Sequence, residues 1–73
     1  MQLVINGQDR DVAGLKEGSA VSDLLAVLQL RGDRVALERN GEIVSRSVWG
    51  ETRLADGDKI EIVHFVGGGK SGL

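Results

Sequence analysis

The sequence predicts an α+β domain in which a mixed β-sheet packs on one helix. Two Asn-Gly dipeptides, at residues 6–7 and 40–41, each lie between segments of strand-like composition, and each therefore predicts a tight hairpin. Between the two hairpins, leucines recur at helical spacing. A last apolar segment of period two covers residues 59–65. At 73 residues, the chain has room for one such domain.

The first hairpin is predicted from alternation. Met1, Leu3 and Ile5 share one face of residues 1–6, as in a half-buried strand. Asn6 and Gly7 supply the positive φ angles of a two-residue turn, and residues 8–13 return as the second strand. Residues 14–19 hold two glycines and a serine and are predicted to form a loop.

A helix is predicted next. Its apolar face consists of residues at helical spacing: Val21, Leu24, Leu25 and Leu28. Ser19 or Ser22 is expected to supply the N-cap oxygen, and Asp23 suits the positive end of the helix. Gly32 is expected to end it.

The second half of the chain is predicted to be mainly strands. Residues 35–39 and 42–45 form the second hairpin, 45–51 form an irregular segment or single turn, 52–54 form a brief edge strand, 56–58 form a turn, and 59–65 form the final strand. Ile60 and Ile62 of the final strand are expected to face inward, and Trp49 is expected to fill the core.

This order of elements predicts a β-grasp, or ubiquitin-like, roll. The helix must bury its leucines against one face of the sheet, and the first and last strands are then natural central neighbours, paired in parallel. We expect the folded domain to cover residues 1–66, followed by a flexible glycine-rich tail at 67–73.

Composition excludes several classes of function. The chain has no cysteine, a net charge of −2 and only two aromatic residues, which argues against zinc clusters, thiol catalysis and nucleic-acid binding. No apolar run approaches the roughly 20 residues that cross a membrane, and no signal peptide is recognisable, so we expect a cytoplasmic protein without a membrane partner. So small a domain has no room for a deep substrate pocket.

The glycines Gly67, Gly68 and Gly69 are the most informative segment. Residues without Cβ atoms can enter a narrow channel on a partner, and four extended residues from Val66 reach about 13 Å. A terminal carboxylate carried there is a poor electrophile, which requires activation, for instance as an acyl-adenylate, before a sulfur nucleophile adds. An inert glycine-rich end remains the alternative.

Two segments carry a family resemblance. Residues 56–69 read DGDKIEIVHFVGGG and residues 38–44 read ERNGEIV. Together with the opening strand and the start of the helix, they resemble the ThiS-type sulfur carriers of thiamine biosynthesis, over residues 1–69. The resemblance implies a protein co-substrate that is not an enzyme and binds no cofactor or metal.

The resemblance also implies a reaction and partners. An E1-like enzyme of the ThiF type uses ATP to adenylate the C-terminal glycine, sulfur originating from cysteine converts it to a thiocarboxylate, and a thiazole synthase of the ThiG type receives the sulfur. By position, Gly69 carries the sulfur, with Gly68 as the second candidate. A molybdopterin-synthase small subunit, or a non-covalent β-grasp binding module, remains the alternative.

Two departures from the family pattern matter. The chain continues after the glycines with Lys70-Ser71-Gly72-Leu73, so we expect a processing protease to remove these residues and expose Gly69. Relatives often place a capping threonine where this chain has Ala20, and we expect Ser19 to compensate.

An apolar segment precedes the glycines. If Ile60 and Ile62 face the helix, alternation turns Val63 and Phe65 to the other face, where with Val66 they form a predicted docking surface. The alternative is that Phe65 folds back over the sheet edge and is only structural.

Other tempting signals have simpler explanations. Gly69-Lys70-Ser71 lacks the earlier glycine and the following helix of a phosphate-binding loop, because His64 occupies the required position. His64 itself has no nucleophile or ligand cluster, so a structural or contact role is expected. Four acids near turns are expected to be solvated surface charges: Glu38, Glu42, Asp56 and Asp58.

Overall fold

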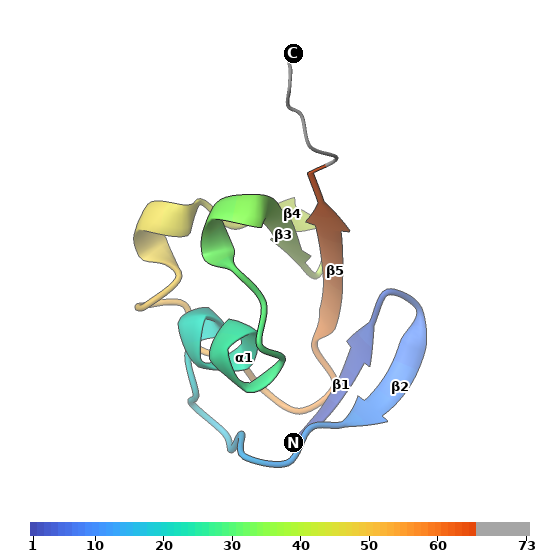
Figure 1. Cartoon of the computed structure of the whole chain (residues 1–73). Coiled ribbons are helices and arrows are strands. Elements are labelled where there is room, and N and C mark those ends of the chain that lie inside the picture. The colour runs from blue at the N-terminus through green and yellow to red at the C-terminus, as the bar shows by residue number, and fades with distance from the viewer. Residues whose placement is uncertain (66–73) are drawn as a thin grey trace.

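The computed structural model describes residues 1–65 as a five-stranded sheet with one α-helix across one face (Figure 1). The strands are β1 (Gln2–Ile5), β2 (Gln8–Asp11), β3 (Val35–Arg39), β4 (Glu42–Ile43) and β5 (Lys59–His64); the helices are α1 (Val21–Val27) and the 3₁₀ turns η1 (Gly32–Arg34) and η2 (Arg46–Val48). The strand order is β2-β1-β5-β3-β4, with β1 and β5 parallel and the other pairs antiparallel. The predicted β-grasp fold, with its first and last strands side by side in the centre, is confirmed. Val66 and the predicted tail at 67–73 lie outside the described residues.

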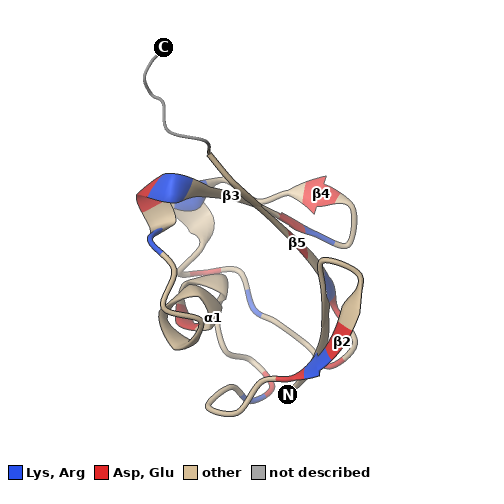
Figure 2. Ribbon diagram, turned by 45° about the vertical axis from the view of Figure 1, so that its right-hand side comes forward, with Lys and Arg blue, Asp and Glu red and all other residues tan. Residues whose placement is uncertain are grey.

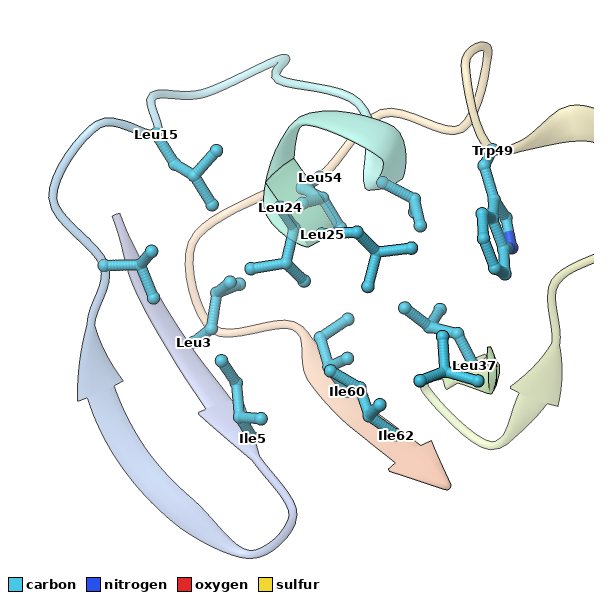
Figure 3. Close-up of a cluster of buried hydrophobic side chains, with 13 residues drawn as sticks. Leu3, Ile5, Leu15, Leu24, Leu25, Leu37, Trp49, Leu54, Ile60 and Ile62 are labelled. Atoms are coloured by element: carbon cyan, nitrogen blue, oxygen red, sulfur yellow. The ribbon is translucent and has the colours of Figure 1, made fainter. Parts of the chain in front are cut away.

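The core lies between the sheet and α1. Figure 3 shows the cluster of buried apolar side chains, in which Leu24 from the helix and Ile60 from β5 are both fully buried. Burying a leucine or isoleucine of this kind contributes roughly 1.5–3 kcal/mol. Trp49 is buried at one end of the cluster, and its indole N–H donates to the carbonyl oxygen of Val44 at 2.8 Å, so its predicted role in the core is confirmed.

Both Asn-Gly turns have the expected geometry. The φ angles are 50° and 81° at Asn6 and Gly7, and 53° and 88° at Asn40 and Gly41. Positive φ at both central residues gives a turn whose twist matches that of the flanking strands, and asparagine tolerates this region better than most residues.

The start of α1 differs from prediction. The N-cap is Ala20, and no side chain caps the first turn from that position. The Asp23 carboxylate reaches back instead and accepts the N–H of Ala20 at 2.9 Å. Ser19 uses its hydroxyl to accept the N–H of Lys16 at 3.1 Å, so the expected serine cap is wrong. The Ser19 hydroxyl is therefore used by the turn that precedes the helix and does not cap the helix.

The end of α1 also differs. The helix ends at Val27, not at Gly32, because the chain reverses at Gln29, whose φ is 60°. The N–H of Leu30 donates to the carbonyl of Leu25 at 2.9 Å, and that of Gln29 donates to Ala26 at 3.1 Å. This is the Schellman pattern, with a glutamine where glycine is usual. Packing of Leu30 against the core favours the early stop, which the helical periodicity did not reveal.

Residues 52–54 do not form the predicted edge strand. A single bridge joins Arg53 to Ala20, and β4 stops at Ile43 rather than at 45. Leu54 is buried, and its backbone pairs with the loop before the helix, donating to Ser19 at 2.7 Å and accepting from Gly18 at 3.0 Å. The segment therefore fastens the start of α1 instead of widening the sheet.

Candidate functional site at the end of the last strand

The described part of the candidate site is the C-terminal end of β5. This strand lies between β1 and β3, and its inward residues Ile60 and Ile62 are buried in the core. Pairing with β3 continues to the strand end, where the N–H of Phe65 donates to the carbonyl of Arg34 at 2.8 Å. The chain therefore stays attached to the centre of the sheet as far as residue 65, four positions before Gly69.

On its other side, β5 is longer than its partner β1. Beyond the end of β1, the side chain of Asn6 makes the hydrogen bonds to β5 that a further strand residue would make. Its Oδ1 accepts the N–H of Ile62 at 2.7 Å, and its Nδ2 donates to the carbonyl of Ile62 at 3.2 Å. One amide side chain thus replaces the next residue of a strand. The sequence showed Asn6 only as a turn residue, because its partner is 56 positions away.

A second asparagine fastens the start of β5. Asn40 Oδ1 accepts the N–H of Lys59 at 2.9 Å, and its Nδ2 donates to Asp58 Oδ1 at 3.1 Å. Asp58 Oδ2 accepts the N–H of Ala55 at 2.9 Å and lies 3.5 Å from the Arg39 guanidinium. Asp58 is only 8% exposed, so its interpretation as a solvated acid is wrong: it organises the turn before β5.

The other three acids at turns and strand edges lie nearer to solvent. Glu42 and Asp56 are exposed and Glu38 is half-buried. Asp56 also has a structural contact, because its Oδ1 accepts the N–H of Gln2 at 3.0 Å.

The predicted exposure of Val63 and Phe65 is confirmed. Their side chains are 58% and 59% exposed, and the alternation of β5 places them on the sheet face opposite α1. Ile43 of β4, which the sequence analysis missed, is 77% exposed on the same face. We call Ala36, Ile43, Val63 and Phe65 the apolar patch. Ile43 could have been placed from the Asn-Gly turn, which fixes its register opposite Glu38.

A shallow hollow of about 260 Å³ borders this patch, lined by Phe65, Ile43 and the buried Trp49 among others. A second hollow of about 260 Å³ includes His64, Asn6 and Arg10. Neither brings a nucleophile next to a base. Within residues 1–65 there is also no group of three side chains suited to a metal ion, and no helix long and apolar enough to span a membrane.

Three charged side chains belong to the segment whose backbone carbonyl, that of Arg34, accepts the hydrogen bond from Phe65. Arg31 donates two hydrogen bonds to Asp33, at 3.0 and 3.2 Å, and Arg34 lies 3.8 Å from the same carboxylate. Desolvation opposes the effect, but these hydrogen bonds and positive charges hold the pKa of Asp33 below its usual value. All three side chains are solvent-exposed, so this cluster is a charged rim and not a catalytic centre.

Comparison with known proteins identifies the family. Residues 3–69 match the model of the ThiS family. The chain belongs to this family. It is 48% identical over 67 residues to the sulfur carrier protein ThiS of Bacillus subtilis, covering 92% of this chain and 98% of that protein. The crystal structure of ThiS from Geobacter metallireducens superposes with a TM-score of 0.80 at 37% identity, covering 94% of this chain and all of the other.

A third relative is larger. The thiazole synthase of Paramagnetospirillum magneticum is 45% identical over 69 residues, which are 94% of this chain but 20% of that enzyme. As a ThiS protein, the chain is a small sulfur carrier of thiamine biosynthesis and not a catalyst. The glycines at 67–69 lie outside the described residues, so their predicted roles stay predictions.

Proposed function

We propose that this ThiS protein carries sulfur on Gly69, with Gly68 as the second candidate, once residues 70–73 are removed. The observation that carries the proposal is the attachment of β5: the chain is held in the sheet as far as Phe65, so its direction is fixed up to that residue. Four more residues span at most about 14 Å, enough for a carboxylate to reach into a partner's active site.

The proposed chemistry replaces one oxygen by sulfur. The Gly69 carboxylate attacks ATP on an E1-like enzyme of the ThiF type, giving an acyl-adenylate and pyrophosphate. Hydrosulfide, whose sulfur comes ultimately from cysteine, then attacks the acyl carbon and displaces AMP. The thiocarboxylate that results gives its sulfur to a thiazole synthase of the ThiG type. In this scheme ATP is bound by the activating enzyme, and the carrier itself binds no cofactor.

Mass spectrometry tests the proposal. A chain ending at Gly69 is incubated with ATP, the E1-like enzyme and a sulfur donor, beside the 73-residue chain and a chain ending at Gly68. We expect a gain of about 16 Da, for one oxygen exchanged for sulfur, in the chain ending at Gly69 only. A shift in the 73-residue chain would contradict the need for trimming, and a shift only in the chain ending at Gly68 would move the carrier position by one residue.

We further propose that Val63, Phe65 and Val66 dock onto the partners. The exposure of Val63 and Phe65, which lie close to the glycines in the sequence, supports this, because solvent-exposed apolar clusters commonly mark interaction sites. Phe65→Ala should weaken binding to thiazole synthase, measured by calorimetry, with little change in melting temperature. The matched control is Val27→Ala, which truncates an exposed valine on α1. A large loss of stability in Phe65→Ala would favour a structural role.

The thiazole branch is preferred to the two alternatives because of the family match. A molybdopterin-synthase small subunit would use the same fold and tail chemistry, and an inert β-grasp module would show no mass shift in the assay above. A cytoplasmic location and a processing protease remain predictions from the sequence, and intact-mass measurement of protein from its native cell tests the second.

A further inference from the structure

Two glutamates are neighbours on adjacent strands, on the outer surface of the sheet. Glu38 of β3 and Glu61 of β5 are direct cross-strand partners, and like charges in such positions destabilise a sheet. Among residues 1–65, neither side chain takes part in an ion pair or accepts a side-chain hydrogen bond from a neighbour. The fold thus keeps an unfavourable pair, and such a break with local rules often marks a functional surface.

The pair belongs to an acidic face. Register places five charged residues on the side of the sheet away from α1: Asp9, Asp11, Glu38, Lys59 and Glu61. This face holds four of the eleven acidic residues and one of the eight basic residues in the described part, so the remainder is balanced at seven of each sign. The strand residues on this face therefore carry a net negative charge, although the N-terminal ammonium group lies 3.4 Å from Asp11. Figure 2 marks the acidic and basic positions along the backbone.

The acidic pair adjoins the apolar patch. Glu38 is the direct partner of Ile43 on β4, and Val63 follows Glu61 by two residues along β5, opposite Ala36. Outward side chains along β5 therefore run from acid to valine to Phe65, toward the end that precedes the glycines. A partner that covers the patch must also approach the two carboxylates.

We propose that the Glu38–Glu61 pair receives an arginine or lysine side chain of thiazole synthase while the apolar patch is buried beside it. A cation between the carboxylates removes their repulsion, and a guanidinium can bond both because its donors form a fork. The inference rests on the proposed function and adds the chemistry by which this carrier selects its partner. A second copy docking through the same face would oppose two acidic surfaces, and anionic lipid or nucleic acid would be repelled.

The proposal predicts opposite effects on folding and binding. Glu38→Gln and Glu61→Gln each relieve the repulsion, so the melting temperature of the free carrier should rise by about 2–4 °C. The same variants should bind thiazole synthase about tenfold more weakly, and their binding should depend less on salt than that of the wild type. A residue with only a structural role would not move stability and affinity in opposite directions.

Titration calorimetry with purified thiazole synthase from the same organism, at low and moderate salt, makes the test. Asp9→Asn is the matched control, because it removes a carboxylate from the same face on β2, two strands away from β5, and should leave affinity within about twofold. Unchanged or tighter binding by both glutamine variants would overturn the inference while sulfur transfer stands. Failure of the proposed function would appear separately, as absence of the 16 Da shift in the same protein samples, and would overturn both.

Discussion

Replacing Asn6 tests how β5 is held at the base of the site. Asn6→Gly removes the two hydrogen bonds to Ile62 but keeps a residue that adopts a φ of 50° without strain. Each bond contributes about 0.5–1.5 kcal/mol, so the loss is about 2 kcal/mol, or about 8–16 °C in melting temperature for a domain of this size. Asn6→Ala should cost about 1 kcal/mol more, because alanine is strained at positive φ.

Thermal unfolding followed by circular dichroism gives the melting temperatures, and amide hydrogen exchange locates the effect. The N–H of Ile62 should lose protection in Asn6→Gly, whereas that of Phe65, which donates to Arg34, should keep it. Asn6→Asp retains the acceptor but places a carboxylate oxygen against the Ile62 carbonyl, so it should also destabilise. A shift below about 2 °C in Asn6→Gly, with unchanged exchange at Ile62, would refute the bridging role.

Three further predictions concern stability. Gln29→Gly should stabilise by about 1 kcal/mol because it relieves the positive φ at the end of α1, whereas Gln8→Gly in β2 should destabilise; urea titration measures both. Gly32→Ala should destabilise the fold by about 1–3 kcal/mol, because the added Cβ would lie 3.0 Å from the Trp49 ring. Gly50→Ala is the control in thermal melts, because its Cβ would meet no atom within 4 Å. Folding lowers the pKa of Asp33, so its ionised side chain stabilises the protein at about pH 6, and this contribution is lost as the pH falls below about 4. The difference in melting temperature between wild type and Asp33→Asn should therefore be smaller in acid than at about pH 6. A difference that grows in acid would contradict the ion pairs of Asp33 with Arg31 and Arg34.

The fold could be predicted because its signals are local. Alternation and the two Asn-Gly turns place the hairpins, and the leucine spacing places the helix. The end of α1 was wrong because Gly32 looks like a helix stop, whereas the actual reversal uses Gln29 and is stabilised by packing of Leu30. The expected serine cap failed for a similar reason, since the hydroxyl of Ser19 is used within the preceding loop.

The candidate site was predictable where it depends on alternation and hidden where it depends on distant partners. Exposure of Val63 and Phe65 follows from the inward position of Ile62. The burial of Asp58 and the bridge from Asn6 to β5 join residues that are far apart in the sequence, and no local pattern reports them. The cross-strand pairing of Glu38 with Glu61 follows only from the strand register, which no local pattern reports.

The central position of β5 links the glycines proposed to carry sulfur, which follow this strand in the sequence, to completion of folding. Within residues 1–65, every strand that contacts β5 precedes it in the chain, and Ile60 and Ile62 fill space that no earlier segment occupies. During synthesis the hydrophobic interior therefore stays open until this last segment emerges and inserts between its neighbours. An incompletely folded chain would offer the proposed activating enzyme neither the apolar patch nor a β5 of fixed direction, so under the proposed function only folded carriers would receive sulfur.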